Sequence, residues 1–428
     1  MTEYVVTGGT PLGGSIQVQG SKNAALPVLA AMATSDICVD ISNCPSISDV
    51  KHTLQVLRMC GRQVEERAGT IRFTDCVTET DISFPEICCM RSGILFAGAV
   101  LGNLGKVRIC SPGGCDIGPR PIDLHLKAFE SLGGRVKTEG DGIISIDGSR
   151  MAGSSLWLDY PSVGATENVM LCAVNIPGFT EIHNAAREPE IEELQWVLNS
   201  MGFTVEGAGT SVICIKGGRH SEVDYAEYTI EADRIVAGTY LTAIAATGGR
   251  GTVTGVSPDK LSSITDILER TGCTVETEGN SISVFTHGRL KRVRNITSGP
   301  YPGFPTDMQP QVMAMLASAD GTSVIRETVF ENRFRHVDEL NRMGADILVR
   351  GDTAIVNGVP LLRGASVRAT DLRSGAALVI AGLTADTQTR VCDNGCIDRG
   401  YADICGDLRA LGANIYRLDD EDEMETQH

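Results

Sequence analysis

The chain has 428 residues, more than one hydrophobic core usually supports, so its length predicts two domains. Its composition, 42% hydrophobic and 21% charged, is typical of a globular protein. The formal net charge of −17 repels nucleic acid and anionic membranes, so we expect neither as a partner. An anionic ligand must therefore be held by a few local Arg and Lys residues. The acidic C-terminal segment 419–428 is expected to be a solvated tail.

Targeting signals and metal motifs do not stand out in the sequence. The N-terminus lacks the charged segment followed by an apolar run that marks a signal peptide, and no stretch of 18 apolar residues predicts a membrane-spanning helix. The 14 cysteines are scattered singly, without a pair at zinc spacing, and most are expected to be small buried hydrophobes in a reducing cytoplasm. We therefore expect a cytoplasmic protein with no metal site and no other cofactor.

One short pattern recurs along the whole chain: an apolar residue, three further residues and then a glycine. The glycines that end it are Gly61, Gly133, Gly202, Gly272, Gly344 and Gly412. They are separated by 72, 69, 70, 72 and 68 residues. This regular spacing predicts six copies of one structural unit of about 70 residues.

Each copy predicts the same order of elements. A helix rich in small apolar residues comes first, as in the sequence ranges 23–34, 91–102 and 164–175. A strand follows, as in 106–111, 179–184 and 250–256. An amphipathic helix then ends at the repeated glycine, and two short alternating strands close the copy. We expect the first helix to be buried and the second to cover the outside, in an α/β (α+β) fold.

Six copies in two domains give three copies each. The first domain is expected over 22–231, with a polar connection at 219–233. Residues 1–21 contain strands but no complete copy, so we expect them to join 232–428 in the second domain. Two chain crossings would make a two-stranded hinge, which suits opening and closing on a ligand.

Cationic residues recur at the start of the small-residue helices. Lys22 and Asn23 follow Ser21, a suitable N-cap, and a helix N-terminus beside an ammonium group is a reasonable anion site. The small-residue helices of the second, fourth and sixth copies begin with Arg91, Arg234 and Arg373, and the fifth has Asp307 at this position. Arg399 lies at the start of the last amphipathic helix. Each alone fits a salt bridge as well as a ligand contact, whereas their shared phase favours a site at a pseudo-threefold axis.

Cys115 lies in "SPGGCDIGPRPIDLH", residues 111–125, which is typical of a loop. A thiol close to Arg120 in such a stretch can have a lowered pKa and act as nucleophile, proton donor or redox sensor. His125 is ten residues away, so a catalytic Cys–His pair is a further alternative. The spacing alone does not separate these roles from a structural one.

Several of these segments together resemble one enzyme family. The segments are "GSKNAALPVLAA", "PGGCDIGPRPIDLH", "NAAREPEI", "FPTDMQPQ", "TVFENRF", "ATDLR" and "IDRGY". The resemblance is to the enolpyruvyl transferases, the family of EPSP synthase, and within it to the UDP-N-acetylglucosamine 1-carboxyvinyltransferases. It extends from about residue 6 to residue 417 and implies an inside-out α/β barrel of two domains, each with three β-α-β-α-β-β units.

The resemblance implies the first committed step of peptidoglycan synthesis, and hence a part in cell-wall biogenesis, cell shape and cell division. The enolpyruvyl group of phosphoenolpyruvate would pass to the 3′-hydroxyl of UDP-N-acetylglucosamine by addition and elimination, with release of phosphate. Cys115 would donate the proton to C3 and be the target of fosfomycin, and Asp307 would be the general base. Lys22, Arg120 and Arg399 would surround phosphoenolpyruvate, with Arg373 on its carboxylate.

The resemblance also implies a set of contacts to the nucleotide sugar. These residues are Asn23, Arg91, Arg120, Pro121, Ile122, Asp123, Leu124, Ser162, Val163, Gly164 and Val329. The chain departs from the family at Ser48 and Tyr160, where lysine is usual. Two alternatives therefore stay open: an enolpyruvyl transferase with another nucleotide or sugar acceptor, and a two-lobed binding protein without turnover. No pattern predicts an oligomeric state.

Overall fold

The computed structural model describes residues 2–111 and 122–419, so Cys115, Arg120 and Pro121 lie outside the described residues. The described chain forms two compact units. The first unit comprises residues 20–111 and 122–231, and the second unit comprises 2–19 and 232–419. Each unit has its own hydrophobic core.

The first unit contains three sheets and their helices, where η denotes a 3-10 helix. In chain order the elements are α1 (Lys22–Ala31), β3 (Cys38–Ser42), α2 (Ser48–Met59), β4 (Gln63–Arg67), β5 (Thr70–Thr74), α3 (Pro85–Cys89), η1 (Arg91–Ile94), α4 (Leu95–Leu104), β6 (Lys106–Cys110), α5 (Asp123–Ser131), β7 (Arg135–Thr138), η2 (Gly140–Gly142), β8 (Ile143–Asp147), β9 (Ser155–Trp157), α6 (Val163–Ala173), β10 (Phe179–His183), α7 (Pro189–Ser200), β11 (Thr204–Glu206), β12 (Val212–Lys216) and β13 (Tyr225–Thr229). The sheet orders are β13-β3-β5-β4, β6-β8-β7 and β11-β12-β10-β9.

The second unit repeats this plan. Its elements are β1 (Thr2–Thr7), β2 (Gly13–Gln17), α8 (Arg234–Ala246), β14 (Arg250–Thr254), η3 (Pro258–Leu261), α9 (Ser262–Arg270), β15 (Thr274–Glu278), β16 (Ser281–Phe285), β17 (Asn295–Thr297), η4 (Thr306–Met308), α10 (Gln309–Leu316), β18 (Thr322–Arg326), α11 (Val337–Arg342), β19 (Asp346–Arg350), β20 (Thr353–Asn357), β21 (Ser366–Arg368), α12 (Leu372–Thr384), β22 (Gln388–Asp393), η5 (Ile397–Arg399), α13 (Ile404–Ala410) and β23 (Asn414–Leu418). The sheet orders are β15-β16-β14-β2, β17-β18-β20-β19 and β21-β22-β1-β23.

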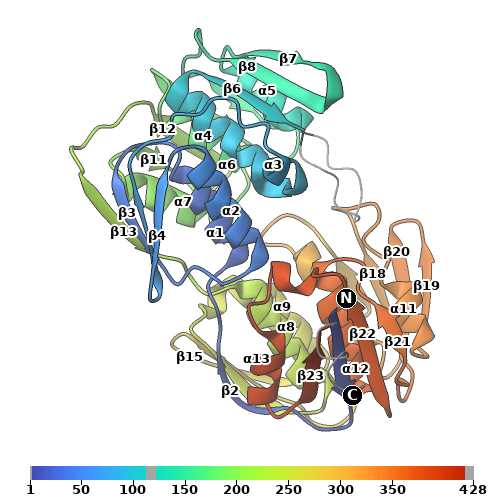
Figure 1. Cartoon of the computed structure of the whole chain (residues 1–428). Coiled ribbons are helices and arrows are strands. Elements are labelled where there is room, and N and C mark those ends of the chain that lie inside the picture. Colours follow the sequence, from blue (N-terminus) through green and yellow to red (C-terminus); the bar gives the residue numbers. More distant parts are fainter. Residues whose placement is uncertain (1, 112–121, 420–428) are drawn as a thin grey trace, which may run out of the picture. The chain divides into compact units, whose positions relative to one another are not determined.

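Strands from distant parts of the sequence complete three of the sheets. In the second unit, β1 lies between β22 and β23, so the first and last described strands are neighbours (Figure 1). β2 pairs in parallel with β14. In the first unit, β13 pairs in parallel with β3, with Tyr225 opposite Cys38. The polar stretch 219–233 therefore contains a strand as well as connecting residues.

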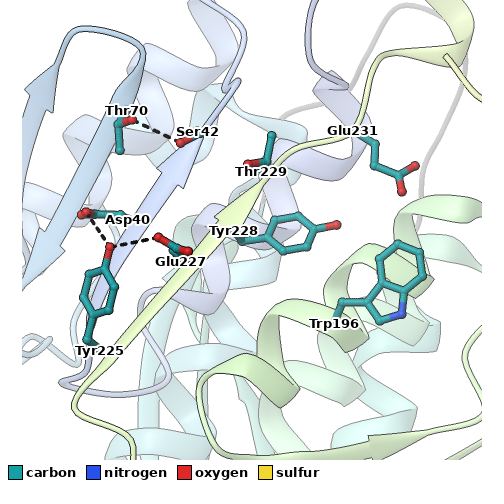
Figure 2. A pocket seen from close by; sticks show the side chains of 9 residues that line it. All are labelled: Asp40, Ser42, Thr70, Trp196, Tyr225, Glu227, Tyr228, Thr229 and Glu231. Atoms are coloured by element: carbon teal, nitrogen blue, oxygen red, sulfur yellow. Dashed lines mark hydrogen bonds between the residues drawn. The ribbon is translucent and has the colours of Figure 1, made fainter. Parts of the chain in front are cut away.

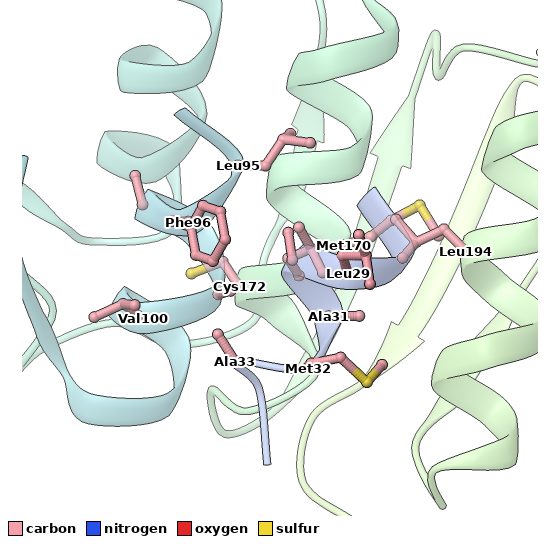
Figure 3. Packing of buried hydrophobic residues seen from close by; sticks show 14 of the residues in the cluster. Leu29, Ala31, Met32, Ala33, Leu95, Phe96, Val100, Met170, Cys172 and Leu194 are labelled. Atoms are coloured by element: carbon pink, nitrogen blue, oxygen red, sulfur yellow. The ribbon is translucent and has the colours of Figure 1, made fainter. Parts of the chain in front are cut away.

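The helices at the centre of each unit are the small-residue helices. In the first unit these are α1, α4 and α6, whose side chains are buried almost throughout, and Figure 3 shows Leu29, Phe96 and Met170 among the packed residues. Small residues allow close approach: a Cβ on Gly98 of α4 would lie 2.2 Å from the backbone oxygen of Asn168 on α6. α8, α10 and α12 are buried in the same way in the second unit.

The amphipathic helices each end before one of the repeated glycines. All six of these glycines have a positive φ, from 87° to 105°, which is the left-handed conformation that favours glycine at a helix end. Buried small-residue helices inside sheets and outer amphipathic helices confirm the predicted inside-out α/β class. None of the described helices is both long and apolar enough to cross a membrane.

The cysteine prediction needs a correction. Cys88 of α3 and Cys110 of β6 form a disulfide with a Cα–Cα distance of 5.7 Å, although neither lies in a recognisable pair motif. Cys76 is exposed rather than buried. The sequence analysis did not predict this pair, because 22 residues separate the two cysteines and only the packing of α3 against β6 brings them together.

Candidate functional site

In the first unit, Lys22 is the first residue of α1 and its side chain is fixed by neighbours. The Oγ atom of Ser21 accepts a hydrogen bond from the backbone N–H of Ala24 at 3.3 Å, which caps the helix. Lys22 is only 9% exposed, and its Nζ lies 2.7 Å from Oδ2 of Asp49 in the first turn of α2. The ammonium group is thus held at the positive end of a helix, with Asn23 next in the chain.

A second helix start in the first unit carries three predicted residues. Ser162 caps α6 through a hydrogen bond from the backbone N–H of Ala165 to its Oγ at 3.3 Å. Val163 and Gly164 follow as the first helical residues. A Cβ on Gly164 would lie 3.3 Å from Cε1 of His125, so the start of α6 packs closely against α5.

His125 joins α5 to α6 rather than standing free. Its Nδ1 accepts a hydrogen bond from Nδ2 of Asn168 at 2.9 Å, and Asn168 also donates to the carbonyl oxygen of Ile94. Burial, reinforced by the charge of Arg91, lowers the pKa of His125 to about 3. A pKa this low makes the imidazole a poor proton acceptor near pH 7, which argues against its use as the base of a Cys–His pair.

The remaining first-unit residues lie at element starts. Arg91 is the first residue of η1, half-buried, and it leads into α4. Ile122 immediately precedes α5, which begins with Asp123 and Leu124. Asp123 is exposed and its Oδ2 lies 3.8 Å from Nζ of Lys127, one turn further along the helix.

In the second unit, Asp307 is held by two buried guanidinium groups. Nη2 of Arg373 donates to Oδ2 of Asp307 at 2.9 Å, and Nη2 of Arg333 donates to Oδ1 at 3.1 Å. The side chains of Arg333 and Arg373 are 2% and 4% exposed, while that of Asp307 is 27% exposed. The carboxylate is therefore held on a rigid cationic support and is itself partly exposed.

The first turn of α12 fixes Arg373. Oδ1 of Asp371 accepts from the backbone N–H groups of Arg373 and Ser374, and the Ser374 hydroxyl completes a capping box. Burial lowers the pKa of Arg373, but the charges of Asp307, Tyr401 and Asp233 outweigh it, so the pKa is raised. Nη1 of Arg373 is buried and has no hydrogen-bond acceptor among the described residues. This donor is suited to an anionic ligand.

Val329 and Arg399 lie in two other loops of the second unit. The backbone N–H of Val329 donates to Oε1 of Glu327 at 2.8 Å, while Oε2 of Glu327 accepts from Thr306, the residue before Asp307. The buried Glu327 thus ties the Val329 turn to the Asp307 turn. Arg399 is the last residue of η5 and is half-buried.

The structure adds supporting residues that the sequence interpretation did not single out. Arg333 lies in the quoted segment "TVFENRF" and Asp371 in "ATDLR", so both were inside recognisable motifs. Asp49 and Asn168 carried no such signal, because only the packing of α1 on α2 and of α4 on α6 brings them to the site.

The two positions that depart from the family, Ser48 and Tyr160, lie close to predicted contacts in the sequence. Ser48 is the first residue of α2 and precedes Asp49. Tyr160 is 42% exposed, and its carbonyl oxygen accepts from the backbone N–H of Ser162.

A hollow elsewhere on the first unit contains none of the predicted residues. Its lining consists of Asp40, Ser42, Thr70, Trp196, Tyr225, Glu227, Tyr228, Thr229 and Glu231 (Figure 2). The Tyr225 hydroxyl donates to Oδ2 of Asp40 at 2.9 Å, and Arg72 binds both oxygens of the same carboxylate. These polar groups are engaged with each other, which is typical of a stabilised sheet surface.

Comparison with known proteins identifies the family. The family model described as EPSP synthase (3-phosphoshikimate 1-carboxyvinyltransferase) matches residues 6–408. A UDP-N-acetylglucosamine 1-carboxyvinyltransferase 1 of Symbiobacterium thermophilum is 47% identical over 422 residues, covering 97% of this chain and 95% of the relative. The enzyme of the same name from Halalkalibacterium halodurans is 46% identical, covering 100% of this chain and 96% of the relative.

Solved structures agree with the fold. The enolpyruvyl transferase NikO of Streptomyces tendae has a TM-score of 0.88 at 24% identity, covering 97% of this chain and 99% of the other. An EPSP synthase of Acinetobacter baumannii has a TM-score of 0.75 at 18% identity, covering 98% of this chain and 100% of the other. At these identities the likeness shows a shared fold. The family match over most of the chain and relatives with more than 40% identity show that the chain is a carboxyvinyltransferase of the EPSP synthase family.

Proposed function

We propose that the chain transfers the enolpyruvyl group of phosphoenolpyruvate to the 3′-hydroxyl of UDP-N-acetylglucosamine and releases phosphate. The single observation that carries this proposal is Asp307, held at 2.9 and 3.1 Å by two buried arginines. One of them, Arg373, keeps a buried donor without an acceptor among the described residues. A carboxylate for the hydroxyl proton beside a donor for the substrate carboxylate is what this addition requires.

Asp307 is the general base in this mechanism. It takes the proton of the sugar 3′-hydroxyl as that oxygen attacks C2 of phosphoenolpyruvate. Arg333 and Arg373 each hold one of the two carboxylate oxygens and so fix the orientation of the carboxylate. Arg373 also binds the carboxylate of phosphoenolpyruvate through Nη1, which places C2 next to the attacking oxygen.

Cations hold the phosphate that departs in the second step. Lys22, at the N-terminus of α1, and Arg399, at the end of η5, supply positive charge, and Arg120 completes this set. After addition, C3 gives up a proton, the double bond re-forms and the C2–O bond to phosphate breaks. The positive groups stabilise the charge that develops on the leaving oxygen.

Cys115 donates the proton that C3 of phosphoenolpyruvate gains during addition. A thiol in a glycine-rich stretch near Arg120 suits this role. We expect fosfomycin to alkylate Cys115, and Cys115→Ser to abolish or severely slow phosphate release while the fold persists. A fosfomycin adduct on another cysteine, or near-native turnover of the variant, would contradict this assignment.

The nucleotide sugar is held largely by the first unit. Asn23, Arg91, Ser162, Val163 and Gly164 lie at helix starts, where the positive end of the backbone dipole suits a diphosphate. Residues 120–124 read the uracil through backbone groups, and Val329 is the remaining proposed contact. The chemistry requires no metal or other cofactor.

We place this reaction in the cytoplasm, as the first committed step of peptidoglycan synthesis and therefore as a part of cell-wall formation, cell shape and division. The names of the relatives support the assignment, and phosphoenolpyruvate and the nucleotide sugar are the proposed partners.

A second candidate function is favoured by Ser48 and Tyr160. Both lie next to predicted contacts: Ser48 precedes Asp49, the partner of Lys22, and Tyr160 precedes the Ser162 cap by two residues. Without lysine at these positions the chain carries less positive charge for a diphosphate. An enolpyruvyl transferase with a different nucleotide or sugar acceptor is therefore the alternative.

The deciding experiment measures phosphate release from phosphoenolpyruvate with a panel of acceptors. UDP-N-acetylglucosamine is expected to support turnover, and shikimate 3-phosphate is expected to support none. Release with another UDP-sugar but not with UDP-N-acetylglucosamine would establish the alternative. No release with any acceptor, from a protein with cooperative thermal unfolding, would favour a binding protein without turnover.

A further inference from the structure

Cys88 and Cys110 are the two cysteines that the structure joins among the described residues. Cys88 is in α3, a helix of five residues, and Cys110 is the last residue of β6. Their Cα atoms are 5.7 Å apart, within the usual range for a disulfide. Ten of the other described cysteines are free thiols.

The bond lies next to a predicted substrate contact. α3 ends at Cys89, and η1 begins at Arg91 after a single intervening residue. The corner between them is tightly packed, because a Cβ on Gly93 would lie 2.7 Å from the carbonyl oxygen of Ile87. A shift of α3 is therefore passed directly to η1 and to Arg91.

Besides the disulfide, the described contacts of α3 are apolar packing and one long side-chain hydrogen bond. The chain before α3 is attached to the strand: the N–H of Ile82 donates to the Arg108 oxygen at 2.7 Å, and the N–H of Arg108 donates to the Thr80 oxygen at 2.8 Å. α3 itself is held by the buried side chain of Ile87 and by a long hydrogen bond of 3.3 Å between Gln55 and Glu86. The disulfide thus extends an existing strand contact to a short helix of five residues.

We propose that Cys88 and Cys110 are a reversible disulfide site that keeps Arg91 in place for the nucleotide sugar. The effect on the sugar rests on the proposed function, whereas the site itself rests only on the geometry of the two cysteines. In a reducing compartment such as the cytoplasm, a disulfide is typically transient and responds to the thiol pool. We expect the reduced protein to have a looser α3–η1 corner and weaker nucleotide-sugar binding.

The oxidant is a low-molecular-weight disulfide. Cys88 is half-buried, whereas Cys110 is only 5% exposed, so Cys88 is the more accessible of the two. The Cys88 thiolate attacks the small disulfide, forms a mixed disulfide and releases one small thiolate. The Cys110 thiolate then attacks the Cys88 sulfur, the protein S–S bond forms and the second small thiolate leaves. The two protons from the cysteines pass to the released thiolates, so the protein loses two electrons and the small disulfide gains them.

The first test maps thiols without using activity. The full chain is equilibrated in glutathione buffers of graded ratio, quenched by an alkylating reagent and digested for mass spectrometry. Cys88 and Cys110 should become protected together with one midpoint and yield a crosslinked peptide, while the exposed Cys76 should show neither. Independent labelling of Cys88 and Cys110, or the absence of their crosslinked peptide at every ratio, would overturn the site.

The second test measures the corner itself by tryptic cleavage after Arg91. Reduction is expected to speed this cleavage about tenfold, because local opening of α3 becomes easier. Cleavage after Arg219, an exposed residue in the same unit, should not change between the oxidised and reduced protein. Equal cleavage after Arg91 in both states would overturn the coupling of the disulfide to η1, whatever reaction the protein catalyses.

The third test uses variants and kinetics. Cys88→Ser and the reduced wild-type protein should both raise KM for UDP-N-acetylglucosamine about three- to tenfold with little change in kcat, because only a binding contact is loosened. Cys76→Ser is the matched control and should not change either constant. A KM that is the same for the oxidised and reduced wild-type protein would contradict the effect on binding. If no acceptor supports turnover, the proposed function fails, and the first two tests still decide the disulfide site.

Discussion

The two units differ in the groups that cap their central helices. In the first unit, α1 and α6 are capped by the hydroxyls of Ser21 and Ser162. In the second unit, α8 and α12 are capped by the carboxylates of Asp233 and Asp371. The same fold therefore presents neutral caps at one set of helix starts and negative caps at the other.

This difference separates two kinds of binding chemistry. A neutral cap leaves the positive end of the helix dipole available, which suits phosphate groups. A carboxylate cap cancels that charge and can also form an ion pair with an arginine. Nη1 of Arg333 lies 3.6 Å from Oδ1 of Asp371, and Arg333 also binds Asp307. We infer that the first unit provides the nucleotide contacts and the second unit provides the proton acceptor and its support.

The largest effect is expected from removing the charge of Asp307. Asp307→Asn should lower kcat about 10³-fold, because the amide cannot take the hydroxyl proton. Asp320→Asn is the matched control, an exposed aspartate of the second unit, and should leave kcat unchanged. Phosphate release under saturating substrates measures both. A fall of less than tenfold for Asp307→Asn would remove it as the base.

A smaller effect is expected from replacing the guanidinium group of Arg373 by an ammonium group. Arg373→Lys keeps the charge, but an ammonium cannot bind Asp307 and a substrate carboxylate in the same planar geometry. We expect kcat/KM for phosphoenolpyruvate to fall about 10²-fold, because both contacts are needed in the transition state. Arg289→Lys, an exposed arginine of the same unit, is the control and should behave as the wild type. Equal kinetics in the two variants would contradict the carboxylate contact.

A pH effect on stability should arise in both units. Burial lowers the pKa of His125 to about 3 in the first unit and that of His336 to about 4 in the second. Because an unfolded histidine binds its proton near pH 6.5 and these folded ones do not, stability is lost as the pH falls below that value. Each histidine should cost about 1.4 kcal/mol per pH unit from 6.5 down towards its folded pKa.

Denaturant unfolding between pH 7 and pH 5 measures this loss. The exposed His287 provides the comparison, since His287→Gln should keep the full slope of stability against pH. His125→Gln and His336→Gln should each reduce that slope, even where they lower stability overall. An unchanged slope in both variants would show that these imidazoles are already protonated or accessible in the folded protein.

The smallest effect compares the two kinds of cap directly. Asp233 accepts from the N–H groups of Ile235 and Val236 at 2.8 and 3.1 Å. Among the described residues, the Ser162 hydroxyl accepts from the N–H of Ala165 alone, at 3.3 Å. Asp233→Ala should therefore cost about 2 kcal/mol of unfolding free energy and Ser162→Ala about 0.5–1 kcal/mol. Equal losses in denaturant titrations would contradict the difference between the caps.

The sequence predicted the repeated plan because each copy encodes it locally. Small-residue helices, amphipathic helices and the glycines that end them are all short-range patterns, and all six glycines have the expected conformation. Contacts between distant segments were not encoded in this way. Arg333 reaches Asp307 across 26 residues, Cys110 reaches Cys88 across 22, and β1 joins β22 from the other end of the chain.

The most direct test of the account combines the wild-type protein and Asp307→Asn in one product analysis. Each is incubated with phosphoenolpyruvate and UDP-N-acetylglucosamine, and the mixture is examined by proton NMR and mass spectrometry. We predict that the wild type forms a UDP-sugar with two vinylic protons and one phosphate released per product, and that Asp307→Asn forms almost none. A wild type that makes no enolpyruvyl ether, or an Asp307→Asn variant that makes it at the wild-type rate, would contradict the account.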